Sequence, residues 1–418
     1  MRDREGDRMQ REEYYSYQED LAFAKELNIL RNDFYYQLID GDAPSLVDFM
    51  YKPLDTLSGD AYTARRIQRD KTFYLIVDGM GKGLSASLTA MMMTSFINHL
   101  IDSMLESEDF LLQRVIQESM SFIQTILLDD ETLSIDYIYY DALNKELHYA
   151  KFAMPSFLLE NTQGEIIRLK SNNMPMSKWQ DRFNIEHYSV EGIEKFLFYS
   201  DGLVANPVKG ERALYSEFIE DDFATSFTRE EFKNRLFSRL KQQEDDLTLI
   251  FINTLNLDKS AFVESRSFET SLEVVQRATE WYSELFHKLT DDVKARYSAS
   301  VVFTELFMNA YEHGNLGIDL EMKHRLLERD VYFERLLSLE QGVQKRIEVK
   351  VYKIENNSSS YVVTQIIDEG EGFDTHILSK IFRNAQKFNG RGVFVSRKNS
   401  MGIYYNCQGN KVLFLNKI

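Results

Sequence analysis

Four short apolar runs in the first 254 residues begin or end at aspartate, and this pattern constrains the fold more than any other feature of the chain. The runs supply Asp60, Asp78, Asp201 and Asp245, with Asp246 directly after the last of these. Buried carboxylates without a partner are very costly, so acids at the edges of several strands need cations to neutralise them. We expect the strands to bring these acids together around metal ions.

The stretch IVDGMGKG at residues 76–83 allows two interpretations of its glycines. A phosphate-binding P-loop is excluded, because Lys82 is followed by Gly83 and not by Ser or Thr. A strand that ends in a carboxylate, followed by glycines that let a backbone carbonyl turn inward, suits a hard divalent cation that prefers oxygen ligands. Two such ions, bridged by aspartate and water, generate hydroxide at neutral pH and clamp a phosphoryl group.

Length and composition bound the class of protein. At 418 residues the chain exceeds what one hydrophobic core usually serves, so we expect two domains. The content of 44% hydrophobic and 28% charged residues is typical of a soluble globular protein. We find no apolar run near the roughly 18 residues of a membrane span, and the charged start MRDREGDRMQREE is not typical of a signal peptide. These features predict a cytoplasmic protein with no membrane contact.

Charge and cysteine content exclude two further classes. The formal net charge of −17 argues against nucleic acid as a partner, because we see no basic patch that offsets the repulsion. The single Cys407 excludes an internal disulfide and fits a reducing compartment. We expect Cys407 to be a small buried residue without a redox role.

The first two thirds of the chain predict a helix followed by an α+β layered domain. Apolar residues recur at helical spacing from Tyr14 to Phe34. Packing of this helix on its own domain and pairing with a second chain, which would make a homodimer, both stay open. Residues 45–254 mix short β-rich runs with helical patterns near 84–127 and 228–242.

The sequence texture changes after residue 254. Residues 271–289 and 298–313 predict helices, and 319–345 predict a long charged helical stretch. The runs IEVKVYKI, YVVTQIID and KVLFLN then predict strands. We therefore expect a domain boundary near 258–265. The chain would comprise an N-terminal helix at 1–40, a first domain at 41–258 and a second domain at 262–418.

Four blocks in this order, SGD, DGMGKGLSAS, YSDG and DDLT, resemble the PPM (protein phosphatase 2C-like) serine/threonine phosphatases of the sporulation stage II protein E type. The resemblance spans about residues 45–254 and implies a β-sandwich flanked by helices. It implies that two Mn²⁺ or Mg²⁺ ions are held by Asp60, Asp78, the Gly79 carbonyl, Asp201 and Asp245. Asp246 would shape the adjoining turn. The sequence KFAMPSF stands where relatives often carry a Gly-His pair, which affects substrate contacts and not the metals.

A second group of motifs lies in the last third of the chain. In order, the motifs contribute Glu305, Asn309 and His313, then Asp368, Gly370 and Gly372, then Gly390 and Gly392. The first three are spaced by four residues, hence on nearly one face of a helix. The last glycines lead into a helix start, which suits phosphate.

These motifs resemble the GHKL (Bergerat-fold) ATP-binding domains, and among them the anti-sigma-factor serine kinases, over about residues 262–418. The resemblance implies an α/β-sandwich that binds ATP with Mg²⁺. Asn309 would be a Mg²⁺ ligand, Asp368 the acceptor for the adenine amino group, His313 a pocket residue, and the four glycines hinges of a lid over the phosphates. Glu305 stands where the family's catalytic base takes the proton of a substrate serine. The charged insertion at residues 318–346 could serve as a docking or dimer element.

Both resemblances are to proteins of bacterial partner switching, and they imply a bifunctional signalling protein. The first domain would dephosphorylate serine or threonine on a STAS-domain anti-sigma-factor antagonist. The second would bind ATP and could phosphorylate the same class of target, with an anti-sigma or sigma factor as a further partner. We hypothesise that the N-terminal helix or ATP occupancy decides which site is ordered.

Three alternatives stay open. The second domain could bind only ATP, or an anti-sigma-type partner, as a regulator of the phosphatase. A histidine kinase would need a phosphoacceptor helix, but His287 in WYSELFHKLTDD lacks the usual His-Glu pair. A binding scaffold would have neither activity.

Overall fold

The chain forms two compact units in the computed structural model, which describes residues 21–22, 25–41, 43–210, 212–356, 359–375, 396 and 399–418. The first unit comprises the chain up to Phe34 together with Asp48–Asn253, and the second comprises Tyr35–Val47 and Thr254–Ile418. The boundaries drawn from sequence instead put residues 35–40 with the N-terminal helix and 41–47 with the first domain. The structure differs because this segment is hydrogen-bonded to the last strands of the second unit.

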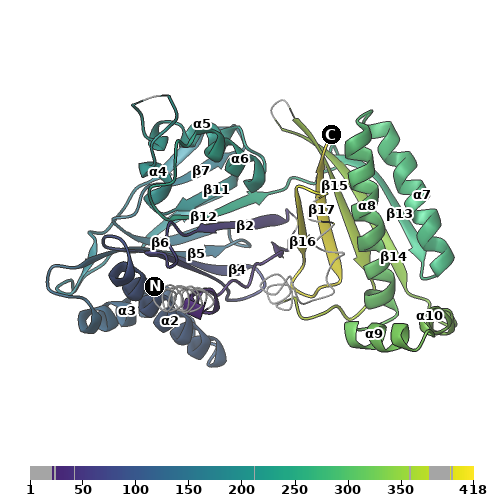
Figure 1. Cartoon of the computed structure of the whole chain (residues 1–418), viewed down its shortest axis with the longest axis horizontal. Helices are drawn as coiled ribbons and strands as arrows, with labels where there is room; N and C mark the ends of the chain where they lie inside the picture. The colour runs from purple at the N-terminus through teal and green to yellow at the C-terminus, as the bar shows by residue number, and fades with distance from the viewer. Residues whose placement is uncertain are drawn as a thin grey trace, which may run out of the picture. The chain divides into compact units, whose positions relative to one another are not determined.

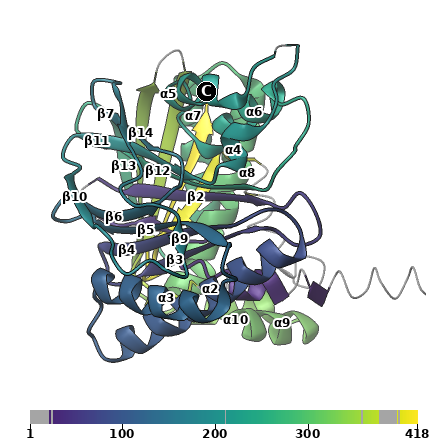
Figure 2. The same ribbon diagram turned by 90° about the vertical axis from the view of Figure 1, so that its left-hand side faces the viewer.

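A sandwich of two sheets makes up most of the first unit, although β1 and the first three residues of β2 fall within the segment Tyr35–Val47 of the second unit. One sheet has the strand order β1-β2-β12-β11-β7-β8 and the other β10-β6-β5-β4-β3, with β9 paired to β5. In chain order the strands are β1 (Leu38–Ile39), β2 (Ser45–Lys52), β3 (Asp60–Arg66), β4 (Lys71–Gly79), β5 (Thr132–Asp141), β6 (Glu146–Phe152), β7 (Phe157–Asn161), β8 (Ile166–Leu169), β9 (Met176–Ser177), β10 (Glu186–Ser189), β11 (Ile193–Tyr199) and β12 (Leu247–Thr254). Figure 2 shows the sheets as stacked layers. The predicted α+β class is confirmed.

Helices cover both outer faces of this sandwich (Figure 1). The β3–β4–β5 sheet carries α2 (Leu84–Glu106) and α3 (Leu112–Ile126). The other sheet carries α4 (Gly202–Ala205), the 3-10 turn η1 (Tyr215–Glu217), α5 (Ile219–Ala224) and α6 (Arg229–Arg239). Helix α6 begins with a capping box, in which Thr228 and Glu231 bond each other's backbone N–H groups.

Strand β4 lies at the centre of the unit because its sequence, KTFYLIVDG, is apolar on both faces. Phe73, Leu75 and Val77 pack against α2 and α3. Tyr74 faces the other way and contacts the ring of Phe198 on β11. Burying each such side chain contributes about 1.5–3 kcal/mol, so β4 and α2 anchor the layer that carries Asp78.

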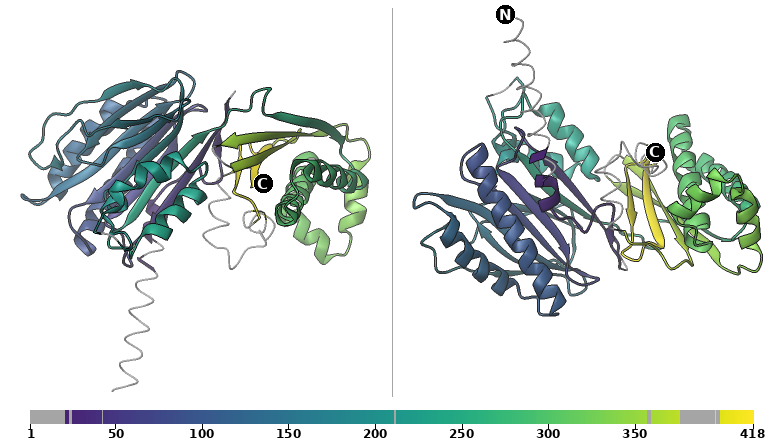
Figure 3. Two further views of the ribbon diagram at one scale, coloured as in Figure 1. Left: turned by 90° about the horizontal axis from the view of Figure 1, so that it is seen from above. Right: turned by 60° about the horizontal axis from the view of Figure 1, so that its bottom comes forward.

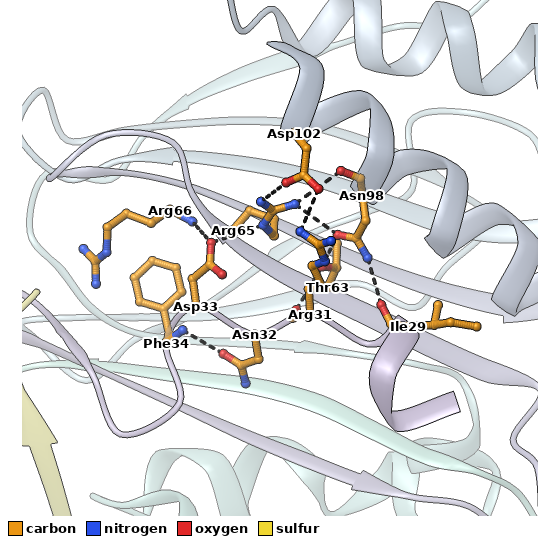
Figure 4. A network of polar contacts seen from close by, with 10 residues as sticks. All are labelled: Ile29, Arg31, Asn32, Asp33, Phe34, Thr63, Arg65, Arg66, Asn98 and Asp102. Carbon is orange, nitrogen blue, oxygen red and sulfur yellow. Dashed lines mark hydrogen bonds and ion pairs between the residues drawn. The ribbon is translucent and has the colours of Figure 1, made fainter. Parts of the chain in front are cut away.

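A polar network fixes the end of the N-terminal helix to the first unit (Figure 4). Residues 21–22 and 25–29 of the helix expected at 14–34 are helical, residues 30–34 are not, and residues 14–20 and 23–24 lie outside the described residues. Arg65 on β3 donates to Asp33 at 3.1 Å and to Asp102 on α2 at 2.6 Å. Asn98 on α2 donates to the carbonyl of Ile29 at 3.0 Å.

Within the described residues one helix, α2, is long and apolar enough to cross a membrane by length and composition, with a mean hydropathy of 1.2 over its best window. This corrects the expectation that no segment approaches that threshold. Of that window, 44% is buried inside the unit, and the helix also presents Asn98 and Asp102 to Arg65. Packing against β4 accounts for the apolar composition of its inner face.

The second unit is a five-stranded antiparallel sheet with α7 and α8 along one face (Figure 3). The strand order is β13-β14-β15-β17-β16. The elements are β13 (Phe262–Glu269), α7 (Leu272–Leu289), α8 (Val293–Asn309), the π-helix η2 (Ala310–Asn315), β14 (Arg346–Asn356), β15 (Ser359–Asp368), β16 (Gly402–Tyr405) and β17 (Lys411–Lys417). Tyr282 of α7 stacks on Phe303 of α8 at a centroid distance of 4.1 Å, which holds the two helices together.

Several expectations for this unit need correction. The stretch 319–345 is not one helix but α9 (Leu320–Glu328) and α10 (Tyr332–Glu340), because the chain turns at Asp330 with a φ of 56°. Helix α8 starts earlier than residue 298, since Asp292 caps it by accepting from Lys294 and Ala295. Cys407 is exposed rather than buried, in the turn between β16 and β17. Gly390 and Gly392 lie outside the described residues.

Candidate functional site

Asp60 and Asp78 lie directly opposite each other on β3 and β4. Asp60 opens β3 and Asp78 precedes the last residue of β4, so both carboxylates stand at the same end of the sheet. Residues directly opposite in an antiparallel pair project from the same face. This face looks toward the second sheet of the sandwich, and Asp60 is 3% exposed.

The end of β11 in that second sheet supplies Ser200 and Asp201. Ser200 Oγ donates to Asp60 Oδ2 at 2.6 Å. Asp201 caps α4 with its carbonyl, and its carboxyl group interacts with that of Asp78. The sandwich therefore brings together three of the predicted aspartates from two sheets.

Asp245 and Asp246 lie before β12 and have different partners. Asp246 accepts the backbone N–H groups of Leu54 and Gly59, each at 2.6 Å, and so fixes the loop that leads into Asp60. Asp245 pairs with Lys82 of the glycine-rich loop at 3.1 Å. The charge of Asp245 also acts on Asp78.

The glycine-rich loop after Asp78 is held between the sheet and α2. Gly79 donates its N–H to the carbonyl of Gly59 at 3.0 Å. A Cβ on Gly79 would lie 2.6 Å from the carbonyl oxygen of Ala86, so only glycine allows α2 to approach this closely. Gly81 and Gly83 have φ values of 82° and 84°, which favour glycine and let the chain enter α2 at once.

The carboxylates have the electrostatics of a cation site. Burial raises the pKa of Asp60 and of Asp78, and the neighbouring carboxylates raise both further. In the part of the chain that the structure describes, no group of three or more Asp, Glu, His or Cys side chains is already arranged as a metal site. The donor set nevertheless fits Mn²⁺ or Mg²⁺, because carboxylate oxygens are the ligands such ions prefer and their charges repel each other here.

In the second unit, Asp368 at the end of β15 packs against the end of η2. A Cβ on Gly314 would lie 2.4 Å from Asp368 Cγ, and one on Gly370 would lie 2.2 Å from the carbonyl oxygen of Gly314. The N–H of Gly370 donates to Asp368 Oδ1 at 2.9 Å. Burial raises the pKa of Asp368 to about 6. The backbone at these two glycines therefore packs closely against the buried carboxyl group of Asp368 and leaves no room for a side chain at either position.

Glu305 faces the same region as Asp368. Burial raises the pKa of Glu305, and the charge of Lys323 opposes that shift. The charges of Glu305 and Asp368 both act on Tyr405, whose pKa is raised first by burial and then further by these two acids. The hydroxyl group of Tyr405 therefore lies within the electrostatic range of both carboxyl groups. Asn309 ends α8, one turn after Glu305.

His313 lies in the π-helix η2, which continues α8 from residue 310. Its charge acts on Glu305 and opposes the rise in the pKa of that carboxyl group. The imidazole of His313 also bonds the carbonyl oxygen of Ile318 and closes the loop after the helix.

Sequence reasoning missed residues that hold the second site together. Asn315 accepts the N–H of Glu369 at 2.9 Å and donates to Thr270 Oγ1 at 2.7 Å, so it joins η2 to the end of β15. The signal was available, since Gly314 and Asn315 directly follow His313. A cavity of about 330 Å³ in this unit lies elsewhere, lined by Arg266, Trp281 and other residues of β13 and α7, and includes none of the predicted residues.

The insertion helices are fastened to η2. Buried Glu312 binds Lys323 of α9 and the hydroxyl group of Tyr332 of α10. Tyr311 donates to Glu340 at the end of α10. The insertion therefore covers the end of the helix that carries Glu305.

Residues 68–255 match the family described as Stage II sporulation protein E (SpoIIE). The match covers 188 of the 418 residues, most of them in the first unit. No curated protein sequence matches the chain.

Solved structures are similar at low identity. The RsbU and RsbW domains of a Mycobacterium tuberculosis protein are 13% identical, with 89% of this chain and 94% of that chain covered and a TM-score of 0.46. The SiaA-PP2C domain of Pseudomonas aeruginosa is 19% identical, with 58% and 98% covered and a TM-score of 0.47. The PP2C domain of SpoIIE from Bacillus subtilis, with a fragment of its regulatory domain, is 15% identical, with 51% and 64% covered and a TM-score of 0.44. At these scores the similarities do not establish a shared activity.

Proposed function

We propose that the first unit is a metal-dependent phosphatase that acts on phosphoserine or phosphothreonine in a protein. The observation that carries the proposal is the convergence of Asp60, Asp78 and Asp201 from two sheets at one end of the sandwich. The SpoIIE match over residues 68–255 supports the same activity.

The proposed metal ligands are Asp60, Asp78, Asp201, Asp245 and the carbonyl of Gly79. Bound Mn²⁺ or Mg²⁺ would supply an activated water and neutralise charge on the phosphoryl group. The chain's own residues position the ligands. Ser200 orients Asp60 through its hydrogen bond, and Asp246 fixes the loop before Asp60.

Hydrolysis of p-nitrophenyl phosphate with Mn²⁺ tests this proposal. We expect activity in the wild-type protein, loss of activity with EDTA, and loss in Asp78→Asn and Asp201→Asn variants that still fold. Asp181→Asn, an exposed acid, is the control and should retain activity. A wild-type protein without metal-dependent activity would favour the binding scaffold.

We propose that the second unit binds ATP with Mg²⁺ in the manner of the GHKL domains. Asp368 would accept the adenine amino group and Asn309 would ligate Mg²⁺, with Gly370, Gly372, Gly390 and Gly392 as hinges. The burial of Asp368 at the end of β15, and its close packing against Gly314 and Gly370 that fixes the carboxyl group in place, support this role. Binding of ATP to the wild type but not to Asp368→Asn, measured by calorimetry, is the expected result.

Two outcomes are open for ATP once it is bound. Glu305 would act as the base if the unit is a serine kinase, and its raised pKa suits a proton acceptor. Alternatively, the unit binds ATP or an anti-sigma-type partner only as a regulator. The proposed substrate, a serine-phosphorylated STAS-domain antagonist, distinguishes the kinase from the regulator when its phosphorylation state is followed on a charge-resolving gel. Mn²⁺ alone should remove its phosphate, and Mg-ATP alone should restore phosphate only if the kinase turns over.

A further inference from the structure

Large apolar side chains gather around the metal-site end of the first unit and are exposed to solvent. The six residues of this surface, which we call the apolar rim, are Met80, Leu84, Leu88, Leu128, Met174 and Trp179. Their exposed fractions run from 55% for Leu88 to 77% for Met174, far above what packing against the core allows. Exposed apolar groups of this size gathered in one place are typical of interaction surfaces.

Strand pairing makes the rim continuous with the proposed metal site. Gly79 is paired with Leu133 of β5, and Leu133 is paired with Met176 of β9. Met80 and the chain on either side of β9, which carries Met174 and Trp179, therefore border the strand end that carries Asp78. Thr132 donates to the sulfur of Met80 at 3.8 Å, which closes the gap between these segments.

The turn before β5 joins the rest of the rim. Glu131 accepts from Ser85 Oγ at 3.5 Å and from the N–H of Leu128 at 2.9 Å, and so connects the start of α2 to this turn. The indole N–H of Trp179 donates to the carbonyl of Asp129 at 3.4 Å. Leu84 and Leu88 are one helical turn apart on α2, so they face the same side.

We propose that the apolar rim docks a folded, serine-phosphorylated protein whose phosphoserine is surrounded by apolar and basic side chains. The proposal rests on the phosphatase function proposed above. The rim adjoins the metal site, so a protein that presents a phosphoserine there must cover it, whereas a small phosphate ester need not. The acidic run at residues 129–131 borders the rim. Asp129 pairs with Lys178 at 2.7 Å, and the charges of Asp130 and Glu131 complement a basic partner.

Two other occupants are less consistent with the same residues. A membrane surface rich in anionic lipid would be repelled by the acidic run and by the net charge of −17. A second copy of this chain would bring the same acidic run against itself unless the contact were offset. Both occupants are outcomes of the test below.

The test compares three substrates on the full-length protein with Mn²⁺. They are a serine-phosphorylated single STAS domain, a short peptide that carries the same phosphoserine, and p-nitrophenyl phosphate. The variants are the double substitution Leu84→Ser with Leu88→Ser, and Met174→Ser, which is distant in sequence and serves if the helix variant does not fold. Leu143→Ser is the control, because Leu143 is 71% exposed just beyond the opposite end of β5.

We expect each rim variant to lower kcat/KM for the folded phosphoprotein by about tenfold or more, the size of effect seen when a docking residue is lost. The peptide, p-nitrophenyl phosphate and Mn²⁺ binding should change by less than about twofold, and the control should match the wild type.

Three results would overturn the inference while leaving the phosphatase intact. They are equal loss on all three substrates, no loss on any, and a wild type that hydrolyses the peptide as well as the folded protein. A wild type that hydrolyses only the aryl phosphate would overturn both the inference and the proposed action on phosphoproteins. The wild type could also co-sediment with anionic vesicles or show the mass of a dimer. If the rim variants lost that property but dephosphorylated the protein as the wild type does, the inference would also be overturned. A wild type inactive on p-nitrophenyl phosphate would remove the proposed function itself, and this inference with it.

Discussion

Glu26, in the N-terminal helix, accepts the backbone N–H of Ser58 at 3.1 Å, two residues before Asp60. The side chain of Glu26 is fully buried and also accepts from the hydroxyl group of Tyr51. Burial raises its pKa. The N-terminal helix of the first unit therefore bonds directly to the loop that leads into a proposed metal ligand.

Replacing Glu26 by alanine should destabilise the first unit. The change leaves the Ser58 N–H and the Tyr51 hydroxyl group without their buried acceptor, which costs about 1–3 kcal/mol. We expect a lower urea midpoint and weaker Mn²⁺ binding, because the loop before Asp60 loses an anchor. Glu26→Gln keeps an acceptor oxygen and should lose less. Equal stability of the alanine variant and the wild type would contradict this role.

Replacing Gly79 by alanine should separate β4 from α2. The added Cβ meets the Ala86 carbonyl at 2.6 Å, and overpacking of this kind costs about 1–3 kcal/mol. Gly41→Ala is the matched control, since nothing lies within 4 Å of its Cβ position. Chemical denaturation should show a loss only for Gly79→Ala, accompanied by lower phosphatase activity. A neutral result at Gly79 would mean that α2 can move away freely.

The sandwich interior also holds an ion pair that the proposed chemistry does not use. Lys151 Nζ lies 2.7 Å from Asp136 Oδ2, and neither side chain is exposed. Burial lowers the pKa of Lys151 to about 8 and raises that of Asp136 to about 6. Lys151→Met leaves a buried, uncompensated carboxylate and should cost about 3–5 kcal/mol at pH 7.5.

The double variant Lys151→Met with Asp136→Leu is the control for that prediction. Removing both charges should restore most of the stability, because buried ion pairs contribute little over apolar replacements. The loss in Lys151→Met should also shrink as the pH falls, since Asp136 then becomes protonated. A double variant as unstable as the single one would show that the pair is needed for packing and not for charge compensation.

We expect the ionised carboxyl group of Asp368 to lower the stability of the second unit and to be needed for ATP binding. Its folded-state pKa of about 6 exceeds the ordinary value of 3.8, so the folded state binds the proton more tightly than the unfolded state. Stability of the second unit should therefore fall as the pH rises from about 4 to about 6, and stay low above that. Asp368→Asn should lack this fall, gain up to about 3 kcal/mol at pH 7, and lose ATP binding. Loss of stability at neutral pH in this variant would contradict the assignment.

The sequence predicted the layered fold because its apolar runs are strong local signals. Strand β4 is apolar on both faces, which predicts a buried strand. The aspartates at the strand ends need cations to neutralise their charge, and this requirement predicted that they lie close together. The four-residue spacing of Glu305 and Asn309 likewise predicted a helix face.

Other features depend on tertiary context that periodicity does not contain. The π-helix at residues 310–315 has no distinct periodicity signal in the sequence, and the break at Asp330 needs a left-handed residue that helix propensity disfavours. The anchoring of Tyr35–Val47 to the second unit depends on contacts such as Asp40 with Lys411, more than 350 positions apart in the chain. The different roles of Asp245 and Asp246 could not be assigned from the sequence. Only the structure shows that Asp246, and not Asp245, accepts the N–H groups of Leu54 and Gly59.

Titration of the wild-type protein with Mn²⁺ at neutral pH, followed by calorimetry, tests the central claim most directly. The account predicts binding of two ions per chain, lost or strongly weakened in Asp60→Asn and Asp78→Asn and unchanged in Asp181→Asn. Wild-type protein that binds no Mn²⁺, or Asp78→Asn protein that binds it as the wild type does, would contradict the proposal that these strand-end carboxylates form a metal site.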